Sequence, residues 1–120
     1  MRPEQFQELR MSGMVFISEE VDWKCNGLVF DAIANAIAKK LDRHDLEINE
    51  AFEPADLFRF VALDNLDIPR FRTVLAAAKE VQREWERAGG VPGCEPSDVI
   101  LNLLRELLDL MCADPRAAKD

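Results

Sequence analysis

Hydrophobic residues recur at spacings of three and four along most of the chain, which is the period of an amphipathic α-helix. Segments rich in glycine, proline, aspartate and asparagine separate these stretches and are typical of turns. The pattern predicts five helices, over residues 3–11, 27–41, 54–63, 69–88 and 97–112. We therefore expect an all-α fold, an irregular bundle of four to five helices in one domain over residues 1–120, with a frayed tail at about residues 113–120.

The ends of two predicted helices carry clear capping signals. Asn26 can accept hydrogen bonds from the free amides at the start of the helix over residues 27–41. Pro69 suits a first turn, so the next long helix starts at about that residue, with Asp67 or Ile68 at its boundary. Gly89 and Gly90 favour its termination after Ala88. For these helices the boundary residues and the apolar period agree.

Two short segments do not follow the helical period. Residues 14–17 form an apolar, partly β-branched run, and residues 46–49 alternate between apolar and polar side chains. Both patterns are typical of strands, so one minor β-ribbon between Met14–Ile17 and Leu46–Asn49 is compatible with the bundle. A two-stranded ribbon is marginal alone and would have to rest on the helices. The sequence leaves open whether the two segments pair.

The last predicted helix has an unusually wide apolar face. On the helix over residues 69–88 the apolar residues occupy one core-facing sector, which Trp85 should anchor. Over residues 97–112 they cover roughly 220° of the helix circumference, more than one neighbouring layer can bury. Either this helix is central and packed on both sides, or part of it contacts a second copy or another protein. The candidate interface residues are Leu101, Leu104, Leu108 and Leu110.

The charge balance predicts a basic partner. Lysine and arginine number 15 and aspartate and glutamate 23, so the net charge is −8 and long-range attraction to nucleic acid is disfavoured. Acidic side chains are densest between residues 42 and 56, in a stretch where only Arg43 opposes them. We expect this acidic segment either to steer and bind a basic protein or to be a solvated connection. Its members are Asp42, Asp45, Glu47, Glu50, Glu53 and Asp56.

Signals for catalysis, metals or cofactors are weak. His44 is the one histidine of the sequence, and its acidic neighbours follow none of the common metal-ligand spacings, so a solvated histidine and no bound metal are expected. The three cysteines, Cys25, Cys94 and Cys112, have no CxxC spacing and are expected to be reduced. No nucleophile elbow, phosphate-binding loop or dinucleotide-binding glycine pattern is present, so we expect no enzyme activity and no cofactor.

Together these features predict a non-catalytic, acidic helical protein-binding module, by analogy an inhibitor or immunity-type protein for a basic partner. One alternative is a homo-oligomeric structural or accessory protein built on the last helix, and another is a small enzyme or ligand carrier. The sequence shows no apolar run of the ~20 residues that a membrane span needs, so we expect a cytoplasmic protein. The partner's identity, the oligomeric state and the existence of a small-molecule pocket are left open.

Overall fold

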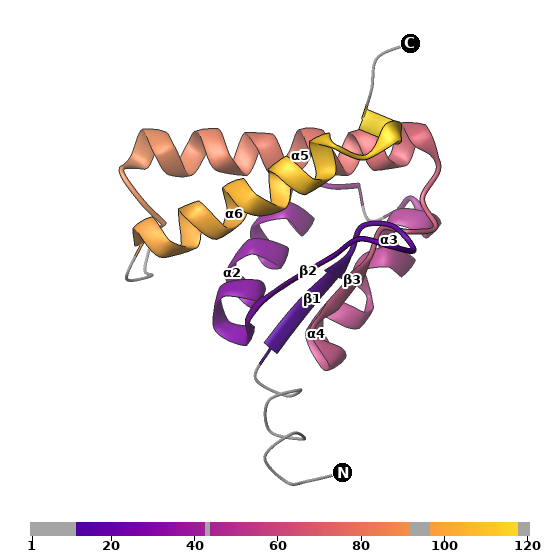
Figure 1. The fold of residues 1–120 in the computed structure, drawn as a ribbon, viewed down its shortest axis with the longest axis horizontal. Coiled ribbons are helices and arrows are strands. Elements are labelled where there is room, and N and C mark those ends of the chain that lie inside the picture. Colours follow the sequence, from indigo (N-terminus) through magenta and orange to yellow (C-terminus); the bar gives the residue numbers. More distant parts are fainter. Residues whose placement is uncertain (1–11, 43, 92–96, 118–120) are drawn as a thin grey trace, which may run out of the picture.

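The computed structural model describes residues 12–42, 44–91 and 97–117, and these form a mixed α/β fold (Figure 1). Three strands make one sheet: β1 (Ser12–Phe16), β2 (Asp22–Asn26) and β3 (Phe60–Ala62). β1 lies in the middle, antiparallel to β2 and parallel to β3. The expectation of an all-α bundle was therefore wrong.

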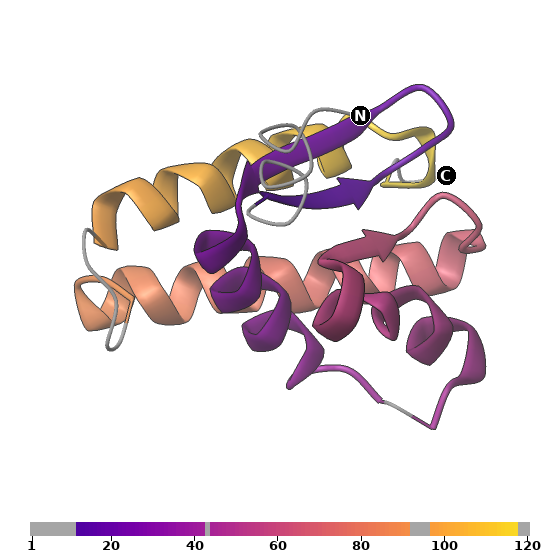
Figure 2. The same ribbon diagram turned by 90° about the horizontal axis from the view of Figure 1, so that it is seen from below.

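The helices cover the sheet and each other in two groups. Figures 1 and 2 show α5 (Ile68–Ala88) and α6 (Ser97–Cys112) side by side as a long pair, with α2 (Gly27–Ala38) and the sheet on one side of this pair. Two short helices, α3 (Leu46–Phe52) and α4 (Pro54–Phe58), lie beside β3. A 3-10 turn, η1 (Pro115–Ala117), follows α6 and returns to the start of α5.

The β1–β2 hairpin pairs two strands of five residues each. Val15 lies opposite Trp23, and both side chains are buried among the helices. The turn is held by the Ser18 hydroxyl oxygen, which accepts hydrogen bonds from the amides of Glu20 and Val21. The strand character of residues 14–17 was recognised from the sequence, but that of residues 22–26 was not, although residues 21–26 alternate between apolar and polar side chains.

The predicted helix over residues 54–63 was wrong in its second half. α4 ends at Phe58, and Arg59 adopts the left-handed conformation with φ 53°, which turns the chain into β3. Val61 then pairs with Val15 in the parallel ladder and is buried. The hydrogen bonds of β1, together with the burial of a β-branched side chain, therefore outweigh the helical period in this segment.

The predicted ribbon between residues 14–17 and 46–49 was wrong as well. Leu46–Asn49 lies in α3, whose N-cap Asp45 accepts hydrogen bonds from the amides of Glu47 and Ile48. Ile48, Ala51 and Phe52 fall on one buried face of that helix, at helical spacing. The two turns of α3 are too short for the alternation at residues 46–49 to be distinguished from a helical period.

The long helices match their sequence signals. α2 begins at Gly27, with the Asn26 side chain accepting from the Leu28 amide at 2.8 Å, and it ends at Ala38 rather than at the predicted Leu41. α5 begins at Ile68 with Asp67 as its N-cap and ends before Gly89, whose φ is 79°. Trp85 is buried as predicted. The predicted helix over residues 3–11 lies outside the described residues.

The expected fraying of the tail was wrong for residues 113–117, which we call the C-terminal turn. Asp114 is a buried charged residue, and Arg116 beside it is half-buried. The guanidinium of Arg116 reaches three backbone carbonyls far away in the sequence, those of Ile17, Leu63 and Leu66. The segment is therefore ordered by long-range hydrogen bonds, which a search for helix caps does not detect. Residues 118–120 lie outside the described residues.

Candidate functional site

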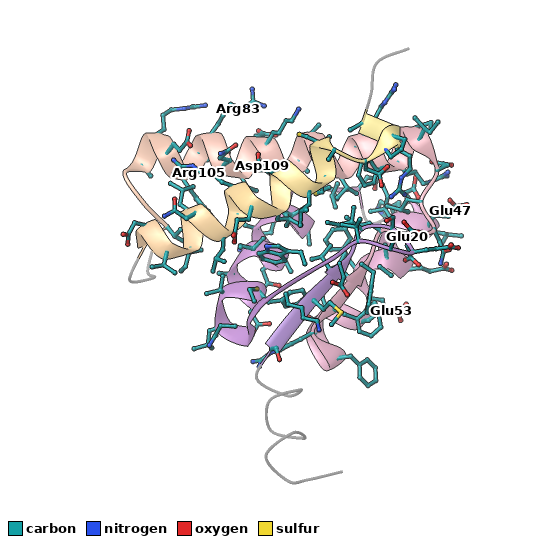
Figure 3. The ribbon with its side chains drawn as sticks, viewed as in Figure 1. Glu20, Glu47, Glu53, Arg83, Arg105 and Asp109 are labelled. Carbon is teal, nitrogen blue, oxygen red and sulfur yellow. The ribbon has the colours of Figure 1, made fainter. Side chains whose placement is uncertain are left out.

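The acidic segment occupies the approach to α3, α3 itself and the start of α4. Figure 3 shows Glu47 and Glu53 toward one end of the long axis, together with Glu20 of the β1–β2 turn. Glu47, Glu50, Glu53 and Asp56 are exposed, and so is Asp42, whose side chain accepts a hydrogen bond from the His44 amide. Most of the predicted partner-binding residues are thus available at the surface.

Asp45 belongs to the fold of this segment rather than to its free surface. Besides capping α3, its carboxylate accepts a hydrogen bond from Arg70 Nε at 2.9 Å. The hydrogen bond from Arg70, followed by those from the α3 backbone, lowers the pKa of Asp45 below its usual value. Arg70 also pairs with Glu47, at 3.2 Å, and with Asp67. The charge of these three acids is therefore partly balanced, whereas Glu50, Glu53 and Asp56 form no ion pair with another described residue.

A second group of acids, which the sequence analysis did not identify, lines a surface groove of about 650 Å³. Because β1 and β3 are parallel, their C-terminal ends lie at the same edge of the sheet, so Glu19 and Glu20 after β1 come close to Asp64 after β3. The C-terminal turn, which lies near the β1–β2 turn in Figure 2, supplies the residues of the opposite wall. Only the parallel pairing brings these distant acids together, and that pairing has no local sequence signal.

Arg116 holds the walls of this groove in place. Its five N–H donors have five acceptors: both carboxylate oxygens of Asp114 and the carbonyl oxygens of Ile17, Leu63 and Leu66. The hydrogen bonds from Arg116 lower the pKa of Asp114 below its usual value. The β1–β2 turn, the β3–α5 connection and the C-terminal turn are thus joined through one side chain.

The candidate interface residues of α6 fall into two pairs. Leu104 and Leu108 are buried in the core of the single chain, with Leu104 0% exposed. Leu101 and Leu110 are half-buried at the edges of that face, and Leu110 also lines the groove. A contact between copies of the chain stays a prediction, now centred on Leu101 and Leu110.

His44 and two of the three cysteines lie within the described residues. His44 is exposed, and no group of three or more histidine, cysteine, aspartate or glutamate side chains within the described part of the chain could hold a metal ion. Burial, and to a lesser extent the charge of Asp31, raises the pKa of the Cys25 thiol to about 12. Its reactive thiolate form is therefore scarce at neutral pH. Cys112 is an exposed free thiol, and Cys94 lies outside the described residues.

Two further observations concern membrane spans among the described helices and the space for a ligand in the core. None of these helices combines the length and the apolar composition that crossing a membrane requires. The core beside Trp23 and Phe30 contains a cavity of about 20 Å³. Pockets for small organic ligands usually measure ~300 to 1,000 Å³, so that cavity is far too small for such a ligand.

Comparison with known proteins gives a single kind of result, a shared fold. No family model matches the sequence, and no curated protein matches it. A similar solved structure is a chain from the complex of the CdiA-CT toxin from Burkholderia pseudomallei E479 with its cognate CdiI immunity protein. The TM-score is 0.72 at 19% sequence identity, over 88% of this chain and 99% of that one. This protein therefore has the fold of a chain found in a toxin–immunity complex.

Proposed function

We propose that this protein is the immunity-type member of a toxin–immunity pair, which binds a basic toxin and neutralises it without catalysis. The observation that carries the proposal is the shared fold, which extends over 99% of a chain from such a complex. Because that likeness is one of fold alone, the choice between the toxin and the immunity role rests on the chemistry of this chain's own surface.

The distribution of charge supports the inhibitory role. The net charge is −8, and two sets of exposed or groove-lining acids lie toward the same end of the molecule. Such a field accelerates association with a positively charged protein and slows approach to a phosphate backbone. In the same region the cation Arg70 is already paired with Asp45, Glu47 and Asp67. The surface therefore suits a basic protein better than a nucleic-acid substrate.

Growth assays test the proposal directly. The proteins encoded by the neighbouring genes are expressed one at a time in a bacterial host, with and without this chain. We expect one of them to stop growth, this chain to restore growth, and the two to elute together as an equimolar complex in size-exclusion chromatography. Growth inhibition by this chain itself, relieved by a neighbour, would reverse the assignment of roles. Failure to relieve any inhibition would overturn the proposal.

The contribution of the acidic segment is tested on the purified complex. Neutralising Glu50, Glu53 and Asp56 together, as Glu50→Gln, Glu53→Gln and Asp56→Asn, leaves the contacts of Arg70 intact. We expect association about tenfold slower and less dependent on ionic strength, because exposed charges act mainly on the encounter rate. The matched control removes the same charge from exposed positions of α6, through Asp98→Asn, Glu106→Gln and Asp109→Asn. Equal rates for both variants would assign no steering role to the segment.

A further inference from the structure

We propose that the groove between the β1–β2 turn and the C-terminal turn is the site that receives a lysine or arginine side chain of the partner. This inference rests on the proposed function, because the occupant is a residue of the basic toxin. The groove would place the cation among Glu19, Glu20 and Asp64 and the aliphatic part of the side chain on Val21 and Leu110.

Negative charge remains unbalanced in the groove. Glu19, Glu20 and Asp64 line it and form no ion pair with another described residue. The other two charged residues of its lining, Asp114 and Arg116, pair with each other at 2.9 Å. The groove therefore carries three negative charges without a counterion from the described residues, whereas Asp45 and Glu47 of the acidic segment share Arg70.

The same groove also contains apolar surface. Val21 is an apolar residue that directly follows two glutamates in a polar turn, and it is 37% exposed. The half-buried Leu110 also lines the groove. The methylene stems of lysine and arginine pack on apolar surface while the charged group remains among polar atoms. An apolar wall beside three carboxylates matches both parts of such a side chain, and a solvated acidic loop would not need that wall.

Hydrogen bonds within the single chain form the groove before a partner binds. Ser18 fixes the turn through hydrogen bonds to the amides of Glu20 and Val21, and the Ile17 amide donates to the Val21 carbonyl at 2.9 Å. Arg116 joins the same turn to the opposite wall through the Ile17 carbonyl. A preformed site loses little conformational entropy when a ligand enters, so even a single inserted side chain can contribute strongly to affinity.

Titration with a basic peptide tests the groove without knowledge of the toxin. The probe is a synthetic nonapeptide of alternating lysine and alanine, added to the isotope-labelled protein and followed by amide NMR. We expect the largest shifts at Glu19, Glu20, Val21 and Asp64, and no such shifts with the matched glutamate–alanine peptide. Shifts confined to Glu50 and Glu53 would overturn the groove as the site, even if the growth assay had succeeded. The absence of any shift would also overturn it.

Variants of the complex provide the second test. Glu19→Gln, Glu20→Gln and Asp64→Asn, combined, are expected to raise the dissociation constant of the toxin complex at least tenfold, as is the single change Val21→Arg, which places a cation in the groove. The α6 control variant described above should bind as the unmodified protein does. Circular dichroism checks that each variant remains folded. Unchanged affinity of both groove variants, in a complex that still protects against the toxin, would overturn the groove while the proposed function stands.

Discussion

Arg116 lies over the ring of Phe71, with its guanidinium carbon 4.0 Å from the ring centroid. Phe71 is fully buried in the first turns of α5, so this contact seats a charged side chain directly on the hydrophobic core. Cation–π attraction strengthens when the pair is shielded from water. Together with its hydrogen bonds, the contact attaches the C-terminal turn to the domain, and Arg72 Nε adds a hydrogen bond to the Arg116 carbonyl.

Replacement of Arg116 should therefore destabilise the fold. We expect Arg116→Met to lower the free energy of unfolding by about 3 kcal/mol, because it removes the guanidinium donors of the Asp114 carboxylate and of three backbone carbonyls. The backbone amides of residues 116 and 66 still donate to Asp114 and to the Leu63 carbonyl. Urea unfolding followed by circular dichroism measures this difference. The control Arg83→Met, at an exposed position of α5, should remain within about 0.5 kcal/mol of the unmodified protein. A similarly small effect at Arg116 would show that the turn contributes little to stability.

The lowered pKa of Asp114 predicts a dependence of stability on pH. A carboxyl whose pKa is lower in the folded protein stabilises the fold above its unfolded pKa of about 4, and this contribution disappears as the pH falls through the folded value. The difference in unfolding free energy between the unmodified protein and Asp114→Asn should therefore be largest at neutral pH. It should shrink steadily below about pH 4. A difference that stays constant from neutral to acidic pH would contradict the assignment.

The parts of the fold that were predictable are those whose stabilising groups lie nearby in the sequence. α5 carries its N-cap Asp67, its first-turn Pro69 and its terminating Gly89 within or beside its own residues. β3 has only three residues and depends on pairing with β1, far earlier in the chain. Its sequence therefore contains little that distinguishes it from the end of α4.

The same difference between local and long-range contacts explains which parts of the candidate site were predicted from the sequence. The acidic segment was visible because its acids lie within a short stretch of sequence, but the pairing of Asp45 with Arg70 was not, since 25 residues separate them. The groove joins residues from three segments, and its wall depends on a contact between Ile17 and Arg116, 99 residues apart. Such a site follows from the topology, and an incorrect all-α topology could not reveal it.

Close packing between β1 and α2 predicts that Gly13 tolerates no side chain. A Cβ atom at this position would lie 2.1 Å from Cγ of Phe30, which is itself buried. We expect Gly13→Ala to lower the unfolding free energy by about 2 kcal/mol, through overpacking. Combined with Phe30→Leu, the cost should be less than the sum of the two single changes. Additive costs in urea unfolding would show that the strand moves away from α2 without strain.

The two pairs of leucines on α6 should respond differently when a leucine is replaced by glutamate. Leu104→Glu should unfold the protein, because its side chain lies in the core. Leu101→Glu should leave a folded protein, since that position is half-buried at the edge. If the edge joins two copies, light scattering at micromolar concentration will show a dimer that Leu101→Glu converts to a monomer. A monomer for both proteins at every concentration would exclude this contact.

The contact across 99 residues between Ile17 and Arg116 determines at which point of synthesis the groove is complete. Hydrogen bonds between distant residues require closure of a long loop, so they form later than local helices and turns. During synthesis, the β1–β2 turn emerges from the ribosome well before the residues that complete the groove. The growing chain therefore has Glu19, Glu20 and Asp64 before the opposite wall exists. The groove is complete only after Arg116 has left the ribosome.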